Sequence, residues 1–150
     1  MRAVAVLVLL LALSGCGNRS APAGPPSGST PPPPTAPSTR PLSTLDTQLC
    51  GELDAAIAKA QKGIAEEEAK GRPWPITRAA VAVVLYGSAA VVYGGLKGAA
   101  EADTAIVAAA NKLGAAMNDL AKTYQGAASK PDTGQLDTAI AEVRAACRRG

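Results

Sequence analysis

Cysteine carries the most reactive side chains in this sequence, and it occurs three times, at Cys16, Cys50 and Cys147. Two thiols that meet outside the cytoplasm oxidise to a disulfide, whereas a thiol without a partner stays open to other chemistry. Cys50 and Cys147 both lie on apolar seams of segments with helical periodicity, so we expect them to pair. Cys16 stands apart from both, directly behind an apolar run at the N-terminus.

The first 16 residues read MRAVAVLVLLLALSGC, which is the layout of a secretory signal with an apolar run too short to span a bilayer comfortably. The last four, Leu13-Ser14-Gly15-Cys16, resemble the lipobox of bacterial lipoprotein precursors. The resemblance covers these 16 residues only. It implies removal of residues 1–15 as a signal peptide, a lipid on Cys16, and anchoring at the extracytoplasmic face of the cell membrane. The alternative is an ordinary signal peptide or an uncleaved anchor.

Residues 16–42 are expected to form a lipidated cysteine followed by a disordered tether. Nine prolines stand between residues 17 and 42, with too few apolar side chains to fold. At about 3.1 Å per residue, an extended proline-rich spacer reaches up to roughly 75 Å. A proline-rich ligand for a partner's groove is the alternative, although nothing in the spacing favours it.

Several classes of function are excluded by composition. Histidine is absent, which excludes most zinc sites and every catalytic triad or general base that needs an imidazole. The net charge of +3 is mild and scattered, which argues against a nucleic-acid partner. No phosphate-binding loop or nucleophile elbow occurs. We therefore expect no enzyme, no metal site and no cofactor.

The composition of residues 43–150 is typical of helices, since 27 of the last 100 residues are alanine, the best helix former. Gly71 is expected to end the first helix and Gly94-Gly95 the second. Asp132 and Gln135 are expected to form a capping box at the start of the last helix. Apolar spacings of three and four residues predict helices at about 43–70, 75–94, 99–125 and 132–148.

The cysteine pair decides the topology of these helices. Cys50 lies near the start of the first helix and Cys147 near the end of the last. A disulfide needs its Cα atoms within about 7 Å, and in an up-down bundle these two ends meet only when the number of helices is even. Three helices would leave them roughly 30 to 40 Å apart. The sequence therefore predicts an all-α, up-down-up-down four-helix bundle closed by a Cys50–Cys147 bond.

The second helix is also a candidate for a membrane span. Residues 79–96 carry no charge between Arg78 and Lys97, which meets the length criterion. However, alanine, glycine and tyrosine dilute the hydrophobicity, and insertion would place Cys147 across the membrane from Cys50. We therefore expect a core helix, and a protein with one span at 79–96 is the alternative.

Candidate partner-binding residues gather at the end of the bundle away from the tether. Trp74 lies between two prolines that fix its backbone, which suits an exposed recognition anchor; the alternative is that it plugs the bundle end over Ile76 and Tyr124. Three consecutive carboxylates spread around a helix axis, so we expect weak ion pairs there rather than a metal site. The charged candidates near Trp74 are Glu66, Glu67, Glu68 and Arg72.

These observations predict a membrane-anchored, extracytoplasmic lipoprotein that is a non-enzymatic interaction module of the cell envelope. Its expected partner, besides the membrane, is an envelope protein or a cell-wall component. The alternative is a carrier that takes a lipid or small apolar ligand into the bundle interior. A carrier requires an internal apolar cavity of a few hundred Å³ or more, whereas an interaction module requires a filled core and an exposed patch.

Overall fold

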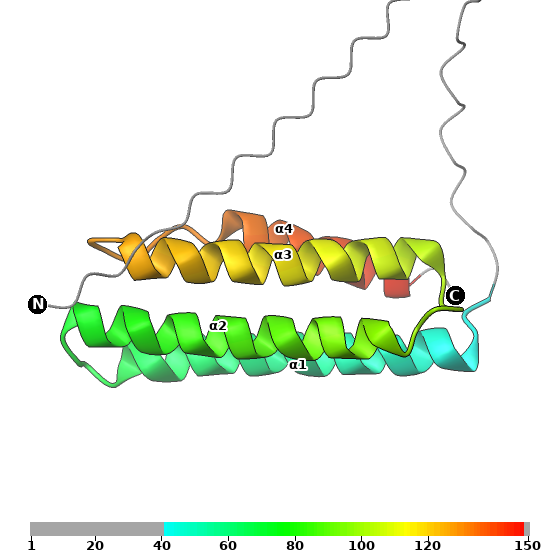
Figure 1. The fold of residues 1–150 in the computed structure, drawn as a ribbon, viewed down its shortest axis with the longest axis horizontal. Helices are drawn as coiled ribbons and strands as arrows, with labels where there is room; N and C mark the ends of the chain where they lie inside the picture. The colour runs from blue at the N-terminus through cyan, green and yellow to red at the C-terminus, as the bar shows by residue number, and fades with distance from the viewer. Residues whose placement is uncertain (1–40, 149–150) are drawn as a thin grey trace, which may run out of the picture. The chain divides into compact units, whose positions relative to one another are not determined.

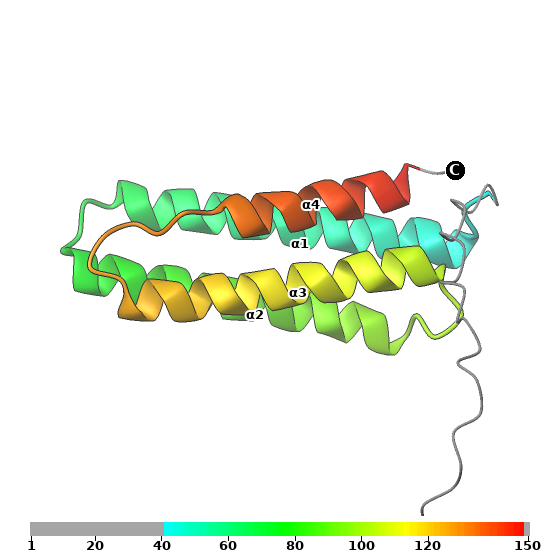
Figure 2. The same ribbon diagram turned by 90° about the horizontal axis from the view of Figure 1, so that it is seen from above.

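The computed structural model describes residues 41–148 of the chain. Successive helices run in opposite directions, so the chain passes up, down, up and down (Figures 1 and 2). The predicted all-α four-helix bundle is therefore confirmed. The predicted signal peptide, Cys16 and nearly all of the tether lie outside the described residues. The helices are α1 (Thr44–Ala69), α2 (Trp74–Lys97), α3 (Thr104–Gly126) and α4 (Gly134–Cys147).

α1, α3 and α4 bury the apolar seams that their spacing predicted, and α2 buries a side that includes Val81 and Leu85. α2 packs against α1 and α3, and α4 packs against α3 and α1 (Figure 2). Burying these seams is the main stabilising contribution to the bundle, although alanine supplies many of the buried positions and removes little area from water. The largest side chains with almost no exposed surface are Leu53, Ile57, Leu85, Ile106, Leu113, Met117 and Tyr124.

Glycine permits close approach between neighbouring helices at two places, half-buried Gly63 and buried Gly114. A Cβ atom at Gly63 in α1 would lie 2.6 Å from Cγ1 of Val84 in α2. A Cβ atom at Gly114 in α3 would lie 2.6 Å from Cζ of Tyr93 in α2. Both glycines therefore make room for a side chain of the adjacent helix, and the distance between helices depends on such small residues.

The first turn follows the prediction, and the second does not. Gly71 adopts a φ of 62°, the left-handed conformation that glycine accepts without strain, directly after α1. The predicted break at Gly94-Gly95 is wrong, because α2 continues to Lys97. Glycine keeps its backbone N–H and so continues the helical hydrogen bonds, and the contacts of α2 with α1 outweigh its low helix propensity.

The start of α3 also differs from the expected position near residue 99. α3 begins at Thr104, because Asp103 is its N-cap and accepts a hydrogen bond from the Ala105 N–H at 2.8 Å. Aspartate at this position satisfies a backbone donor that the helix itself leaves without a partner. The six residues from 98 to 103 form the α2–α3 connection.

The predicted capping box of α4 is wrong. Gln135 takes no part in it, and the N-cap is Thr133, one residue after the expected Asp132. The Asp132 carboxylate accepts instead from the Gly134 N–H at 3.1 Å, two residues ahead. Aspartate commonly makes such a local turn, which competes with its role as a helix cap.

Candidate interaction surfaces

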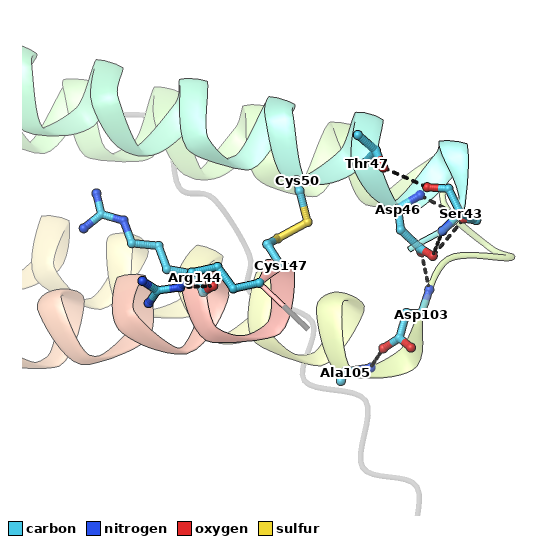
Figure 3. The surroundings of a disulfide bond; sticks show 9 residues. Ser43, Asp46, Thr47, Cys50, Asp103, Ala105, Arg144 and Cys147 are labelled. Carbon is cyan, nitrogen blue, oxygen red and sulfur yellow. Dashed lines mark hydrogen bonds between the residues drawn. A yellow bond between two sulfur atoms is a disulfide. The ribbon is translucent and has the colours of Figure 1, made fainter. Parts of the chain in front are cut away.

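The disulfide lies at the end of the bundle where α1 begins and α4 ends (Figure 3). Cys50 projects from α1 and Cys147 from α4, and their Cα atoms are 5.8 Å apart. This is the short distance predicted for the two ends of a bundle with an even number of helices. Cys50 is buried, whereas Cys147 is half-buried. Beside the bond is a hollow of about 450 Å³ whose lining includes Asp54, Arg144 and Arg148. The bond therefore joins the first and last helices at the edge of the core.

A buried carboxylate strengthens the same end of the bundle. Asp46 is 1% exposed, and its Oδ2 accepts from the backbone N–H and the hydroxyl of Ser43 at 2.9 and 2.8 Å. Its Oδ1 accepts from the Asp103 N–H at 2.7 Å, which fixes the α2–α3 connection to α1 (Figure 3). The sequence analysis missed this group, although Ser43-Thr44-Leu45-Asp46 has the spacing of a capping box.

Trp74 lies at the opposite end of the bundle, where its side chain is half-buried. Its ring centroid is 5.9 Å from that of Tyr124, and its indole N–H donates to the Ala127 carbonyl at 2.9 Å. Arg78 donates to the same carbonyl at 2.8 Å. The ring therefore packs on Tyr124 and joins α2 to the α3–α4 connection, which favours the plug over the recognition anchor. Ile76 does not share this burial, because it is 52% exposed.

Tyr124 and Glu68 form a second polar contact beneath this plug. The Tyr124 hydroxyl donates to Glu68 Oε1 at 2.9 Å, and Lys130 donates to Glu68 Oε2 at 2.6 Å. Burial raises the pKa of Tyr124 well above its ordinary value, and the hydrogen bond to the Glu68 carboxylate raises it further. The neutral phenol is therefore the form that the folded protein stabilises.

Stability is expected to fall as the pH rises through about 10, where tyrosine ionises in the unfolded chain. Because the pKa of Tyr124 is raised in the folded state, its contribution is complete below that pH and is lost above it. Urea unfolding at pH 8 and pH 10.5 measures this loss. Tyr124→Phe should be less stable at pH 8 and less sensitive to the change of pH. An unchanged pH dependence in Tyr124→Phe would contradict the assignment.

The three consecutive carboxylates contact different partners. Glu67 forms ion pairs with Lys70, at 2.6 Å, and with Arg72, whereas exposed Glu66 lies 3.7 Å from Lys62. These are surface pairs that contribute little to stability. Among residues 41–148, no group of three or more acidic, cysteine or histidine side chains could hold a metal ion. The expected arrangement of separate ion pairs is therefore observed.

The interior of the described bundle is filled with side chains. Leu113, Met117 and Tyr124 have no exposed surface. Two hollows of about 450 Å³ each lie at the surface, one beside the disulfide and one between α1 and α2, and charged residues line both.

α2 exposes an uncharged apolar strip. Its large exposed members are Ile76, Val83 and Val91, at 52%, 70% and 49%, and along residues 41–148 no other large hydrophobic side chain is as exposed. By length and composition alone, α2 is also long and apolar enough to cross a membrane. Of its most apolar stretch of 18 residues, 33% is buried within the bundle. We call the exposed strip the outer face of α2; it consists of Ile76, Ala79, Val83, Gly87, Ala90, Val91 and Gly94.

The sequence analysis did not find this face, because it treated residues 79–96 as a core helix. The signal was present: a helix that is apolar on all sides needs cover on all sides, and one bundle covers only part of it.

Compared with known protein families, curated proteins and solved structures, the chain shows no significant match.

Proposed function

We propose that the protein is a lipid-anchored interaction module of the bacterial cell envelope, with the outer face of α2 as its binding surface. The observation that carries the proposal is the confinement of the large exposed hydrophobic side chains in residues 41–148 to one face of one helix. Contiguous exposed apolar surface on a small protein marks a site of interaction. No catalytic chemistry is proposed.

The contrast with the other three helices supports this surface. α2 buries one side in the core through Val81 and Leu85, and all its exposed positions from residue 76 to residue 94 are uncharged. The exposed positions of α1, α3 and α4 include charged side chains, as expected of surfaces that face water. Trp74 is less suited to bind a partner, since its ring and its N–H are already engaged.

The lipid anchor rests on the lipobox and on the disulfide. Cys16 follows the signal-like run, and the other two cysteines are bonded to each other, so neither competes for its chemistry. A disulfide persists in an oxidising compartment, which agrees with an extracytoplasmic location. α1 begins at Thr44, so the tether joins the bundle at the disulfide end.

A photo-crosslinking residue at Val83, introduced in the full chain in cells, tests the binding surface. We expect a covalent adduct in the membrane fraction, because Val83 is the most exposed large side chain on the outer face. The matched control carries the same residue at Ala115, which is exposed on α3. Equal labelling from both positions, or none from either, would reject the surface.

The same preparation tests the anchor. Cys16→Ser removes the thiol that the lipobox assigns to the lipid, so we expect its intact mass to lack the acyl chains that the unchanged protein carries. Acyl chains on Cys16→Ser, or none on the unchanged protein, would reject lipid anchoring through this residue.

A further inference from the structure

We infer that the partner of the outer face of α2 is a second copy of this chain, with the two α2 helices antiparallel and crossing at Gly87. The inference rests on the proposed binding surface and names its occupant. Four features of the described residues support it: the symmetry of the face, its exposed glycines, its lack of charge and its extent.

The face is symmetric about Gly87. Val83 and Val91 lie four residues to either side of it, and Ala80 and Gly94 lie seven residues to either side. Steps of four and seven residues return to the same side of a helix. In an antiparallel pair centred on Gly87, each Val83 therefore meets the Val91 of the other copy, and each half-buried Ala80 meets a Gly94. The face is complementary to itself.

The exposed glycines do not make room for side chains of this bundle. A Cβ atom at Gly87 or Gly94 would meet nothing within 4 Å, in contrast to Gly63 and Gly114, which make room for neighbouring side chains. Gly51 in α1 has the same open space, so what distinguishes Gly87 and Gly94 is their place on the uncharged face of α2. Glycine on a helix face lets a second helix approach closely, whereas a lipid surface gains nothing from it. A helix is therefore the better occupant.

Charge also favours a second copy over an anionic membrane. No charged residue lies between Arg78 and Lys97, so pairing the face with itself brings no like charges together over residues 79–95 of α2. The adjacent rim on α1 carries both signs equally, with Glu52 and Glu66 beside Lys59 and Lys62. Helices that bind anionic lipid carry predominantly Lys and Arg beside their apolar face.

The extent of the surface is sufficient for a dimer. The layer formed by α1 and α2 is about 36 Å long, from the 24 residues of α2 at about 1.5 Å each, and about 20 Å wide. A contact that takes in the adjacent side of α1 as well as the outer face of α2 covers about 700 Å² on each copy and about 1,400 Å² in total, which lies within the range of specific interfaces. The proline-rich tether over residues 17–42 reaches up to roughly 75 Å, so both copies can remain anchored in one membrane.

Cysteine crosslinking of the full chain in its membrane tests the pairing. Gly87→Cys should form a disulfide-linked dimer on mild oxidation, since the two-fold axis places this position against itself and the native Cys50–Cys147 bond leaves no competing thiol in the bundle. Val83→Cys expressed together with Val91→Cys should crosslink more strongly than either alone. Ala115→Cys, exposed on α3, is the control and should stay monomeric.

Gly87→Leu separates loss of pairing from loss of folding. Added to the Val83→Cys and Val91→Cys pair, it should reduce crosslinking by about tenfold or more, because the leucine holds the helices apart. The fold should be intact or more stable, since leucine is the better helix former and has open space there. Gly51→Leu, exposed on α1 with the same open space, is the matched control and should crosslink normally.

The outcomes separate this inference from the proposed function. Self-crosslinking of Val83→Cys and of Val91→Cys, without the mixed product, would indicate parallel helices and overturn the antiparallel pairing. A Val83 photo-adduct with a different protein or with lipid, and no species of twice the chain mass, would retain the binding surface and overturn the second copy. Absence of any adduct from Val83 would overturn both.

Discussion

Replacing Cys50 and Cys147 together by alanine is expected to lower the free energy of unfolding by about 4 kcal/mol. The bond joins residues that are 97 positions apart, and a crosslink that closes so long a loop stabilises the fold by up to about 4.7 kcal/mol through the restricted unfolded chain. Domains of this size have a total stability of only about 5 to 15 kcal/mol. Urea unfolding monitored by circular dichroism measures the difference.

Two controls accompany the cysteine variant. The unchanged protein unfolded with reductant should match the double variant, because both lack the same constraint. The slope of the free energy against urea should rise when the bond is absent, since the unfolded chain then exposes more surface. A loss below about 1 kcal/mol would show that packing of the α1 and α4 seams, rather than the bond, holds the bundle closed.

Asp46→Ala is expected to destabilise the fold by about 3 kcal/mol, the second largest effect. The change deprives two backbone N–H groups, those of Ser43 and Asp103, of a carboxylate acceptor in a buried place. Buried donors left without a partner cost about 1 to 3 kcal/mol each, whereas the backbone N–H of residue 46 keeps its hydrogen bond to the Ser43 hydroxyl. The midpoint of thermal unfolding at pH 7 measures the effect.

Asp54→Ala is the matched control, since Asp54 is an exposed aspartate in the same helix. Its effect should stay within about 0.5 kcal/mol, as for most surface substitutions. Asp46→Asn should lie between the two, because it keeps one acceptor oxygen but loses the charge that strengthens the hydrogen bonds. A similar loss in Asp46→Ala and Asp54→Ala would mean that the general charge of α1 matters rather than the buried acceptor.

The architecture followed from sequence because two independent signals agreed. The spacing of Leu49, Leu53 and Ile57 predicts a buried seam, and all three are buried. Cys50 and Cys147 can meet only if the number of helices is even, and this condition then selects four helices over three. The helix boundaries were predicted less accurately, because they depend on competing local contacts. α2 continues past Gly95, where it packs against α1, and the Asp132 carboxylate accepts from the Gly134 N–H in a local turn instead of capping α4.

The surfaces were harder to predict than the fold. The contact of Trp74 with Tyr124 was among the alternatives, since both lie near the same end of the bundle. Asp46 was missed because a lone aspartate in a helix is normally exposed, and its burial depends on the Asp103 N–H, 57 residues away. The outer face of α2 has no periodicity to detect, because its core side and its exposed side are both apolar.

The Cys50–Cys147 bond makes the backbone between these residues a closed covalent ring. The α1–α2, α2–α3 and α3–α4 connections all lie inside that ring. A protease that cuts once in any of them opens the ring but releases no fragment. A nicked molecule therefore keeps its full mass under oxidising conditions and stays attached to whatever holds its N-terminal end. The cut becomes visible only when the bond is reduced.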